Sequence, residues 1–495
     1  LTHSIAKNIS FKNFAITKAS LYVIRVVVDK LKRIFNGRKK NKAIFDTLCN
    51  KLIEQNNAYL VDSKSMKLRT YLYEVIGICY LDEKYFNYIE NCHLVLAQVL
   101  DNNKEPSGQI NLKRVLFDLN GIYRSISYTK IISVFTKICY PKVQELLQQF
   151  GSANLGDSSF VVLLIDFYAH LFERTTQNFQ VNQSQAVTFK IISDACRMIS
   201  MLLAELNGAI EKLGSLEAIL QFVTANIKIV KKFLIAFESL LKNSDISFSV
   251  FHYFGSEEFL NFSRSIFRFL CLIANCLITH FPDKQPLYFS VIKEGIRCLA
   301  DYILEYFAVE DINSIFKMLL QIYEKRMNTM LAESQSKSNA EDSVIEDLTF
   351  MLKALLVCMY QEYRIYVDDA TYQQKLMTII SSNKVLAVDF CLKAIELAHS
   401  TNSSSKQISY LSDIVFFFVV VFHSQDILSA VVQELVAREN DQATKDYVCV
   451  CFEALTARLR PAIDDSNKEE FFKHFGGLVK YIGQKQRNRA SSQHS

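Results

Sequence analysis

The stretch YFNYIENCHLVLAQVL, residues 85–100, decides the fold class of this chain. Its apolar members recur every three or four residues, which is the stripe that an α-helix buries against its neighbours: they are Tyr85, Tyr88, Ile89, Cys92, Leu96 and Val99. The same spacing returns along the chain, for example at Ile312, Ile315, Phe316 and Leu319. Only 5 prolines and 13 glycines interrupt 495 residues, so we expect helices almost throughout.

So many one-sided helices cannot share one core, because a single core stops growing near ~250–300 residues. A solenoid lets each helix pair bury its apolar face on the next pair. We therefore predict an all-α fold, a right-handed α-solenoid (superhelix) of HEAT-type antiparallel helix pairs, continuous over residues 1–484. We expect the polar segment 332–343 to be an exposed inter-helix loop and residues 485–495 a flexible basic tail. The predicted helices are 16–35, 41–57, 65–81, 85–102, 110–126, 129–150, 158–175, 184–208, 214–242, 256–281, 286–307, 311–332, 344–366, 370–382, 385–399, 406–423, 426–438, 441–460 and 465–484.

The composition of the chain limits the binding partners and the compartment that we expect. The chain carries 56 basic and 51 acidic residues, and this small excess gives no reason to expect direct nucleic-acid binding. The 12 cysteines are scattered singly, mostly on apolar stripes, which is typical of a reducing compartment. The longest apolar run, 414–422, is far shorter than the ~18–20 residues that span a bilayer, so we expect no membrane insertion. Because the first residue is Leu1, we expect sequence upstream.

The sequence offers no catalytic chemistry. It contains no P-loop and no GxGxxG, GxSxG, HExxH or CxxC motif, so we expect no enzyme and no cofactor. Cys271, Cys276 and His280 are the best metal-ligand candidates, but spacings of five and four on one helix place the first and last on opposite faces. Cys449 and Cys451 diverge likewise. We therefore predict no metal site.

One cluster of positive charge stands out in the segment KLKRIFNGRKKNK, residues 30–42. It is a candidate contact site for an acidic partner. It can also be a solvated helix end, because basic side chains complement the dipole of a helix C-terminus, or a nuclear-localisation segment. Its basic residues are Lys30, Lys32, Arg33, Arg38, Lys39, Lys40 and Lys42.

Five segments in collinear order, over about residues 60–480, resemble a known family. DLNGI at 118–122 followed by ICYP at 138–141 resembles the "DLxGI … YP" block of the exportin-7 branch of nuclear transport receptors, also called Ran-binding proteins 16 and 17. FSVFHYFG at 248–255, which runs into Glu257 and Glu258, is similar to that branch's "NFGVFRLYGDD". Residues 69–81 resemble its "RTTFYTALGRLL", 162–174 resemble a family helix, and CFEAL at 451–455 is similar to its "CFENL".

These segments consist mostly of helix-core and turn residues, so none of them marks an active site. We expect Gly121 to permit a close backbone approach or a kink, and Pro141 to begin the next helix, where its missing N–H costs nothing. The chain departs from the family by having no tryptophan and by carrying Lys137 where the family has a tryptophan before its "IYP". The related exportin-4 branch is an open alternative.

The resemblance implies the C-terminal half of a karyopherin of the importin-β superfamily. Such a receptor would bind protein cargo together with GTP-bound Ran, contact Phe-Gly nucleoporins, and shuttle between nucleus and cytoplasm. Its principal Ran contacts would lie in the N-terminal half. The alternative is a helical-repeat scaffold subunit of a pore, coat or tethering complex, which would not respond to the nucleotide state of Ran.

Overall fold

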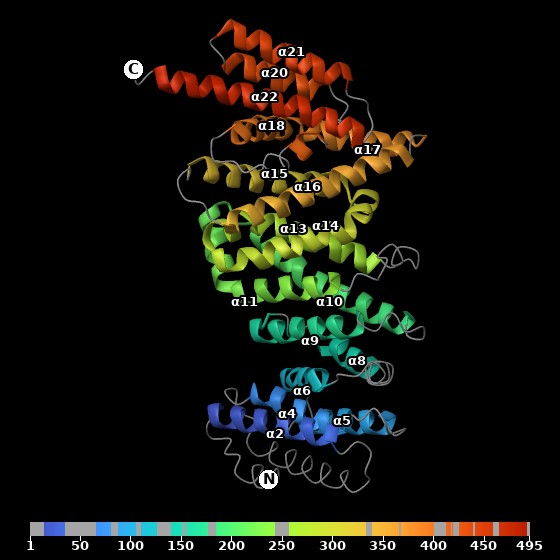
Figure 1. Ribbon diagram of the computed structural model, residues 1–495. Helices are drawn as coiled ribbons and strands as arrows, with labels where there is room; N and C mark the ends of the chain where they lie inside the picture. The colour runs from blue at the N-terminus through green and yellow to red at the C-terminus, as the bar shows by residue number, and fades with distance from the viewer. Residues whose placement is uncertain are drawn as a thin grey trace. The chain divides into compact units, whose positions relative to one another are not determined.

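The computed structural model is all-α in the part of the chain that it describes (Figure 1). An isolated bridge between Lys104 and Ile110 is the one β-type pairing among those residues. The described residues are 14–34, 66–80, 88–104, 110–125, 140–150, 154, 156–176, 185–242, 257–332, 339–365, 368–399, 412–416, 418, 425–438, 441–458 and 465–492.

The chain divides into two compact units. Unit 1 comprises Leu1–Leu202 and Thr224–Asn261, and unit 2 comprises Leu203–Val223 and Phe262–Ser495. The division therefore falls within three helices, α10 (Gln185–Glu211), α11 (Leu216–Leu241) and α13 (Glu257–His280). Each unit is described by itself below.

Among the described residues, six further helices lie wholly in unit 1. Their buried faces are made of Leu, Ile, Val, Phe and Tyr side chains, as the apolar spacing predicts. They are α2 (Phe14–Ile34), α4 (Leu68–Tyr80), α5 (Tyr88–Asn102), α6 (Leu112–Ser125), α8 (Tyr140–Phe150) and α9 (Ser158–Thr176).

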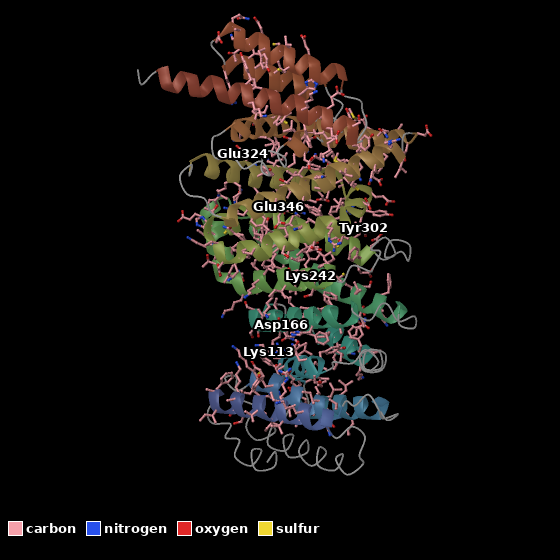
Figure 2. All side chains as sticks on the ribbon, viewed as in Figure 1. Lys113, Asp166, Lys242, Tyr302, Glu324 and Glu346 are labelled. Atoms are coloured by element: carbon pink, nitrogen blue, oxygen red, sulfur yellow. The ribbon has the colours of Figure 1, made fainter. Side chains whose placement is uncertain are left out.

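In the described part of unit 2, eight named helices and a short 3-10 turn belong to this unit alone, and residues 412–416 are also helical. Side chains fill the spaces between successive helices, and Tyr302, Glu324 and Glu346 mark three of these helices in Figure 2. The elements are η2 (Pro282–Lys284), α14 (Gln285–Tyr306), α15 (Val309–Ala332), α16 (Asn339–Ile365), α17 (Ala370–Ser382), α18 (Lys384–His399), α20 (Gln425–Arg438), α21 (Gln442–Arg458) and α22 (Asp465–Ser492).

The packing alternates along the chain in both units. In unit 1, α4 packs against α2 and α6, and in unit 2, α14 packs against α16. Contacts between a helix and the next helix but one arise when helices form two layers and each layer stacks on itself. Short connections join neighbours, such as 307–308 between α14 and α15. Each unit is thus a helical-repeat stack, which confirms the predicted fold class, while the hand of the superhelix stays a prediction.

Polar side chains fix several helix ends. Asp157 precedes α9, and its Oδ1 accepts hydrogen bonds from the Ser159 and Phe160 backbone N–H groups at 2.9 and 3.4 Å, which makes it the N-cap. At the C-terminal end of α14, the last backbone carbonyls have no hydrogen-bond partner within the helix. Lys375 on α17 donates to two of them, the carbonyls of Leu304 at 2.6 Å and Glu305 at 3.1 Å.

The predicted helix boundaries agree closely with the structure, with two corrections. The segment 332–343 is not a loop throughout, because α15 ends at Ala332 and α16 begins at Asn339. The predicted flexible tail is wrong for residues 485–492, because α22 continues through Ser492. In both places a mostly polar segment extends the helix beyond its apolar stripe. Several predictions lie outside the described residues: the helix 41–57, residues 129–139 of the helix 129–150, most of the helix 406–423, and the family-like segment 248–255.

Candidate functional site

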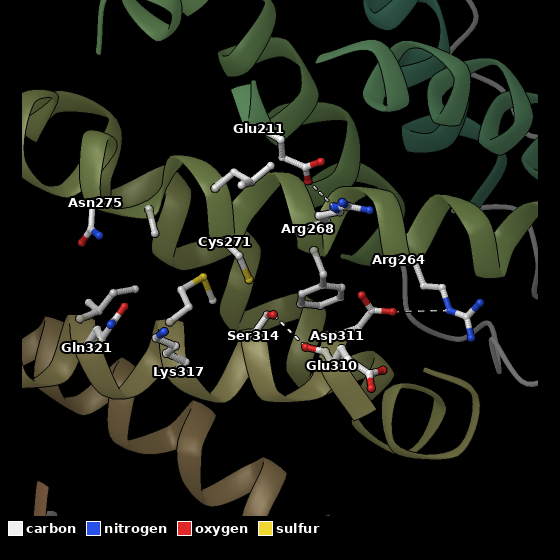
Figure 3. Close-up of a pocket in the computed structure, with 15 residues that line it drawn as sticks. Glu211, Arg264, Arg268, Cys271, Asn275, Glu310, Asp311, Ser314, Lys317 and Gln321 are labelled. Atoms are coloured by element: carbon white, nitrogen blue, oxygen red, sulfur yellow. Dashed lines mark hydrogen bonds and ion pairs between the residues drawn. The ribbon is translucent and has the colours of Figure 1, made fainter. Parts of the chain in front are cut away.

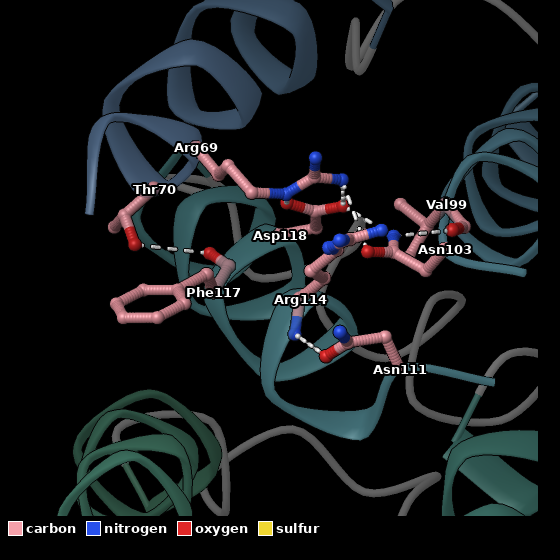
Figure 4. A network of polar contacts seen from close by, with 8 residues as sticks. All are labelled: Arg69, Thr70, Val99, Asn103, Asn111, Arg114, Phe117 and Asp118. Atoms are coloured by element: carbon pink, nitrogen blue, oxygen red, sulfur yellow. Dashed lines mark hydrogen bonds and ion pairs between the residues drawn. The ribbon is translucent and has the colours of Figure 1, made fainter. Parts of the chain in front are cut away.

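Helices α4 and α6 bring together two of the segments that carry the family resemblance (Figure 4). The Arg69 guanidinium donates from Nε to Asp118 Oδ1 at 2.7 Å and from Nη2 to Asp118 Oδ2 at 2.5 Å. Asn103, just after α5, donates to Asp118 Oδ2 at 2.6 Å and accepts from Arg69 at 3.1 Å. All three side chains are buried. The network therefore joins three helices from within.

The electrostatics of this network fit a structural role. Burial raises the pKa of Asp118 to about 6, while the Arg69 charge and the hydrogen bonds from Arg69 and Asn103 oppose the rise. Burial lowers the pKa of Arg69, but attraction to Asp118 outweighs it and the pKa is raised overall. The pair is consequently ionised at neutral pH. With no exposed face, it cannot meet a partner or a substrate.

Glycine sets the spacing of the same two helices. A Cβ atom at Gly121 would lie 2.9 Å from the Glu74 backbone nitrogen and from Tyr73 Cβ, and closer still to the Thr70 carbonyl oxygen. Real Cβ atoms essentially never approach within 3.0 Å. The expected close backbone approach at Gly121 is thus confirmed, and Pro141 lies in the first turn of α8 as expected.

The structure places only part of the basic cluster. Lys30, Lys32 and Arg33 lie on the last turns of α2, and the Lys30 side chain is exposed. The other members, Arg38, Lys39, Lys40 and Lys42, lie outside the described residues. The structure therefore does not test whether the seven residues form one site, and the cluster stays a hypothesis.

A pocket of about 490 Å³ lies in unit 2, between α13 and α15 with one residue from α10 (Figure 3). Its floor is apolar and includes Phe267, Cys271 and Met318. Below the floor, the Tyr288 hydroxyl donates to the Leu270 carbonyl at 2.9 Å and lies 3.3 Å from Met318 Sδ. The Phe267 ring meets Phe307 edge to face, with centroids 6.0 Å apart.

Charged side chains line the rim of this pocket. Arg268 donates from Nε to Glu211 Oε1 at 2.5 Å, which ties α13 to α10. Arg264 lies 4.0 Å from Asp311, across the pocket on α15, and donates to the Tyr306 carbonyl. These pairs fix the walls, while much of each charged side chain stays in solvent. The rim therefore offers ion-pair contacts above an apolar floor.

The rejected metal candidates lie on α13, as predicted. Cys271 lines the pocket, Cys276 is buried and His280 is exposed, so the three do not converge. Burial raises the pKa of the Cys271 thiol to about 12, with Asp311 adding to the rise, so the thiol is protonated and a poor nucleophile. In the described part of the chain, no group of three His, Cys, Asp or Glu residues has the geometry to hold a metal ion.

Sequence reasoning missed the pocket. Its only signal in the sequence was the pairing of charges at 264, 268, 310 and 311 on the exposed stripes of two helices. Such charges are the normal solvated face of a helix. Which of them face each other depends on how α13 and α15 stack, and helical spacing alone does not specify this.

Helix α13 is long and apolar enough to cross a membrane, by length and composition alone. Of its most apolar 18-residue stretch, 61% is buried inside the fold, and buried core helices of soluble proteins are often equally long and apolar. Its outward side carries the Arg264 and Arg268 charges of the pocket rim.

Comparison with known proteins finds likeness in structure alone. No family model matches the chain, and no curated protein matches it. Among solved structures, the crystal structure of an engineered protein aligns with 97% of this chain and 98% of its own, at 10% sequence identity and a TM-score of 0.36. At that score the likeness carries no argument about function.

Proposed function

We propose that this chain is a binding and transport protein of the nuclear transport receptor type, similar to the exportin-7 branch. It would take up protein cargo together with GTP-bound Ran, pass Phe-Gly nucleoporins, and shuttle between nucleus and cytoplasm. The proposal rests on the five collinear segments, and the fold class is compatible with it.

One observation carries the proposal. The segments 69–81 and 118–122 resemble the family separately, and in this chain they build one helix–helix contact through Arg69, Asp118 and Gly121. A chance resemblance between helix-core patterns has no reason to select residues that pair with each other 49 positions apart. These residues set the spacing and register of α4 and α6.

Stacked repeats suit such a function mechanically. Each repeat contacts mainly its neighbours, so a small rotation at every interface adds up to a large change in curvature. Cargo can then be held in one curvature and released in another. A buried network such as Arg69–Asp118–Asn103 keeps its own interface fixed, and the change in curvature must occur at interfaces with less specific packing.

The test is the binding of Ran in its two nucleotide states. Beads carrying Ran loaded with GTP or with GDP are incubated with these 495 residues and with any longer product that the transcript encodes. We expect the longer product to prefer the GTP form, and the 495 residues alone to bind weakly. Equal binding to both forms, or none by either product, would favour a scaffold subunit of a pore, coat or tethering complex.

A further inference from the structure

Two charges on the rim of the α13–α15 pocket have no partner within the described part of the chain. These are the Lys317 ammonium and the Glu310 carboxylate, both on α15 and both exposed. They differ from their neighbours on the rim, since Arg268 is paired with Glu211 and Arg264 faces Asp311. The pocket therefore presents one available cation and one available anion.

The two charges lie at opposite ends of the apolar floor. Figure 3 shows Lys317 beside Gln321 and Asn275 at one end, and Glu310 beside Asp311 at the other. Seven residues separate them on α15, which is two helical turns or about 10.5 Å. Cys271 lies between the two ends (Figure 3), so the pocket presents a cation, an apolar floor and an anion in that order.

An extended peptide matches this spacing. Successive side chains of a strand alternate in direction, so residues i, i+2 and i+4 share one face and span about 13 Å. Charged side chains are long enough to absorb the difference of about 3 Å between this span and that of the two α15 residues. The groove is open to solvent along its charged rim, which suits a surface segment of another protein better than an enclosed small molecule.

We propose that this groove docks an extended peptide segment of a partner protein with the pattern basic–x–apolar–x–acidic. The acidic residue pairs with Lys317, the apolar side chain covers the floor at Cys271 and Met318, and the basic residue pairs with Glu310. The ion pairs between α10, α13 and α15 keep the walls in place before binding, which reduces the ordering cost of docking. The proposal does not depend on Ran binding or on transport.

The test uses fluorescein-labelled peptides and the full chain in fluorescence anisotropy titrations. The matching probe is GSRSLSEGS, and the charge controls are GSRSLSRGS, GSESLSEGS and the uncharged GSSSLSSGS. We expect the matching probe to bind best, by roughly three- to tenfold over each charge control, because each mismatched end replaces an exposed ion pair by repulsion or by nothing. Replacing its leucine by alanine should weaken binding by about tenfold.

Charge reversal in the protein gives a gain of binding as well as a loss. Lys317→Glu should weaken GSRSLSEGS and strengthen GSRSLSRGS, and Glu310→Lys should weaken GSRSLSEGS and strengthen GSESLSEGS. A gain of binding cannot come from a misfolded variant. Lys231→Glu, which makes the same charge change at an exposed position of α11 outside the groove, should leave every affinity unchanged.

Three outcomes would overturn the proposal. They are no saturable binding of any probe, equal binding of all charge patterns, and an effect of Lys231→Glu as large as that of Lys317→Glu. A chain that fails the Ran test but shows this charge-swap pattern keeps the groove and loses only the transport function.

Discussion

The substitution Gly121→Ala tests the tightest helix contact of unit 1 directly. It adds one methyl group to α6 at a point where two of the three nearest atoms belong to the α4 backbone. Neither the Thr70 carbonyl nor the Glu74 nitrogen can rotate away as a side chain would. The two helices must therefore move apart, by about 0.5–1 Å, to restore ordinary contact distances.

The size of the effect follows from three contributions. Overpacking of a core costs about 1–3 kcal/mol, and a backbone obstacle puts this site at the upper end. Separation of the helices also weakens the 3.0 Å hydrogen bond from Thr70 Oγ1 to the Phe117 carbonyl, a loss of about 0.5–1.5 kcal/mol. The higher helix propensity of alanine, compared with glycine, offsets about 0.5–1 kcal/mol of this cost. We expect a net destabilisation of about 3 kcal/mol.

Hydrogen–deuterium exchange with mass spectrometry measures this effect where it occurs. The chain forms two units, so a global melting curve would mix their transitions. A local loss of about 3 kcal/mol accelerates amide exchange in α4 and α6 by roughly 150-fold. The matched control is Gly208→Ala on α10, where an added Cβ meets nothing within 4 Å, and we expect exchange there to stay equal or slow slightly.

Gly77→Ala should give an intermediate result. Its obstacle is the Ser125 side chain, whose Oγ donates to the Ile122 carbonyl at 2.5 Å and can rotate away at the cost of that hydrogen bond. The reasoning fails if Gly121→Ala exchanges like the native chain, or if Gly121→Ala and Gly208→Ala have the same effect. Either result would mean that α4 and α6 do not approach as closely as Gly121 requires.

Three further predictions concern buried charge, a helix cap and thiols. Arg69→Met or Asp118→Leu alone should cost about 3–5 kcal/mol by leaving a buried charge unpaired, and the double variant should cost less than either, as hydrogen exchange of the α4 and α6 amides will show. Asp157→Ala should destabilise α9 by about 1 kcal/mol near neutral pH. A hydrogen bond from its lysine partner lowers the pKa of Asp157 to about 2, so its stabilisation is present above about pH 4 and is lost as the pH falls towards 2; exchange near pH 7 and pH 3 tests this. Burial raises the pKa of both Cys271 and Cys391 to about 12, so iodoacetamide should leave both unmodified in the native chain, whereas mass spectrometry should find all 12 cysteines alkylated after denaturation.

The helices were predictable because each one carries its own period. The stripe in residues 85–100 and the breaks at Gly and Pro fix where a helix buries its face, and α17 has the predicted bounds, 370–382. The ends at Asn339 and Ser492 were missed because these helices extend through mostly polar residues that carry no apolar stripe. Apolar periodicity indicates which face of a helix is buried, so it gives no signal where a helix continues beyond its buried face.

The contacts between helices were only partly predictable. Gly121 stood out because a helix interior rarely keeps a glycine without a packing reason, and the close approach to α4 supplies one. The partner of Asp118 did not stand out, because nothing in the spacing of residues relates position 69 to position 118. The pocket was invisible for the same reason, since Lys317 and Arg264 belong to separate stripes that only the stacking of α13 and α15 brings to one rim.

Residues that the fold requires are thus easier to predict from the sequence than residues that only binding requires. Buried residues such as Arg69 and Gly121 satisfy constraints that every helix of a stack imposes on its neighbours, so they leave traces that one sequence can reveal. An exposed residue such as Lys317 satisfies no internal constraint, and its replacement should leave the stack intact while it changes what the groove binds. The charge-swap experiment at Lys317 and Glu310 therefore examines function without disturbing the fold, and the glycine series on α4 and α6 examines the fold without touching the groove.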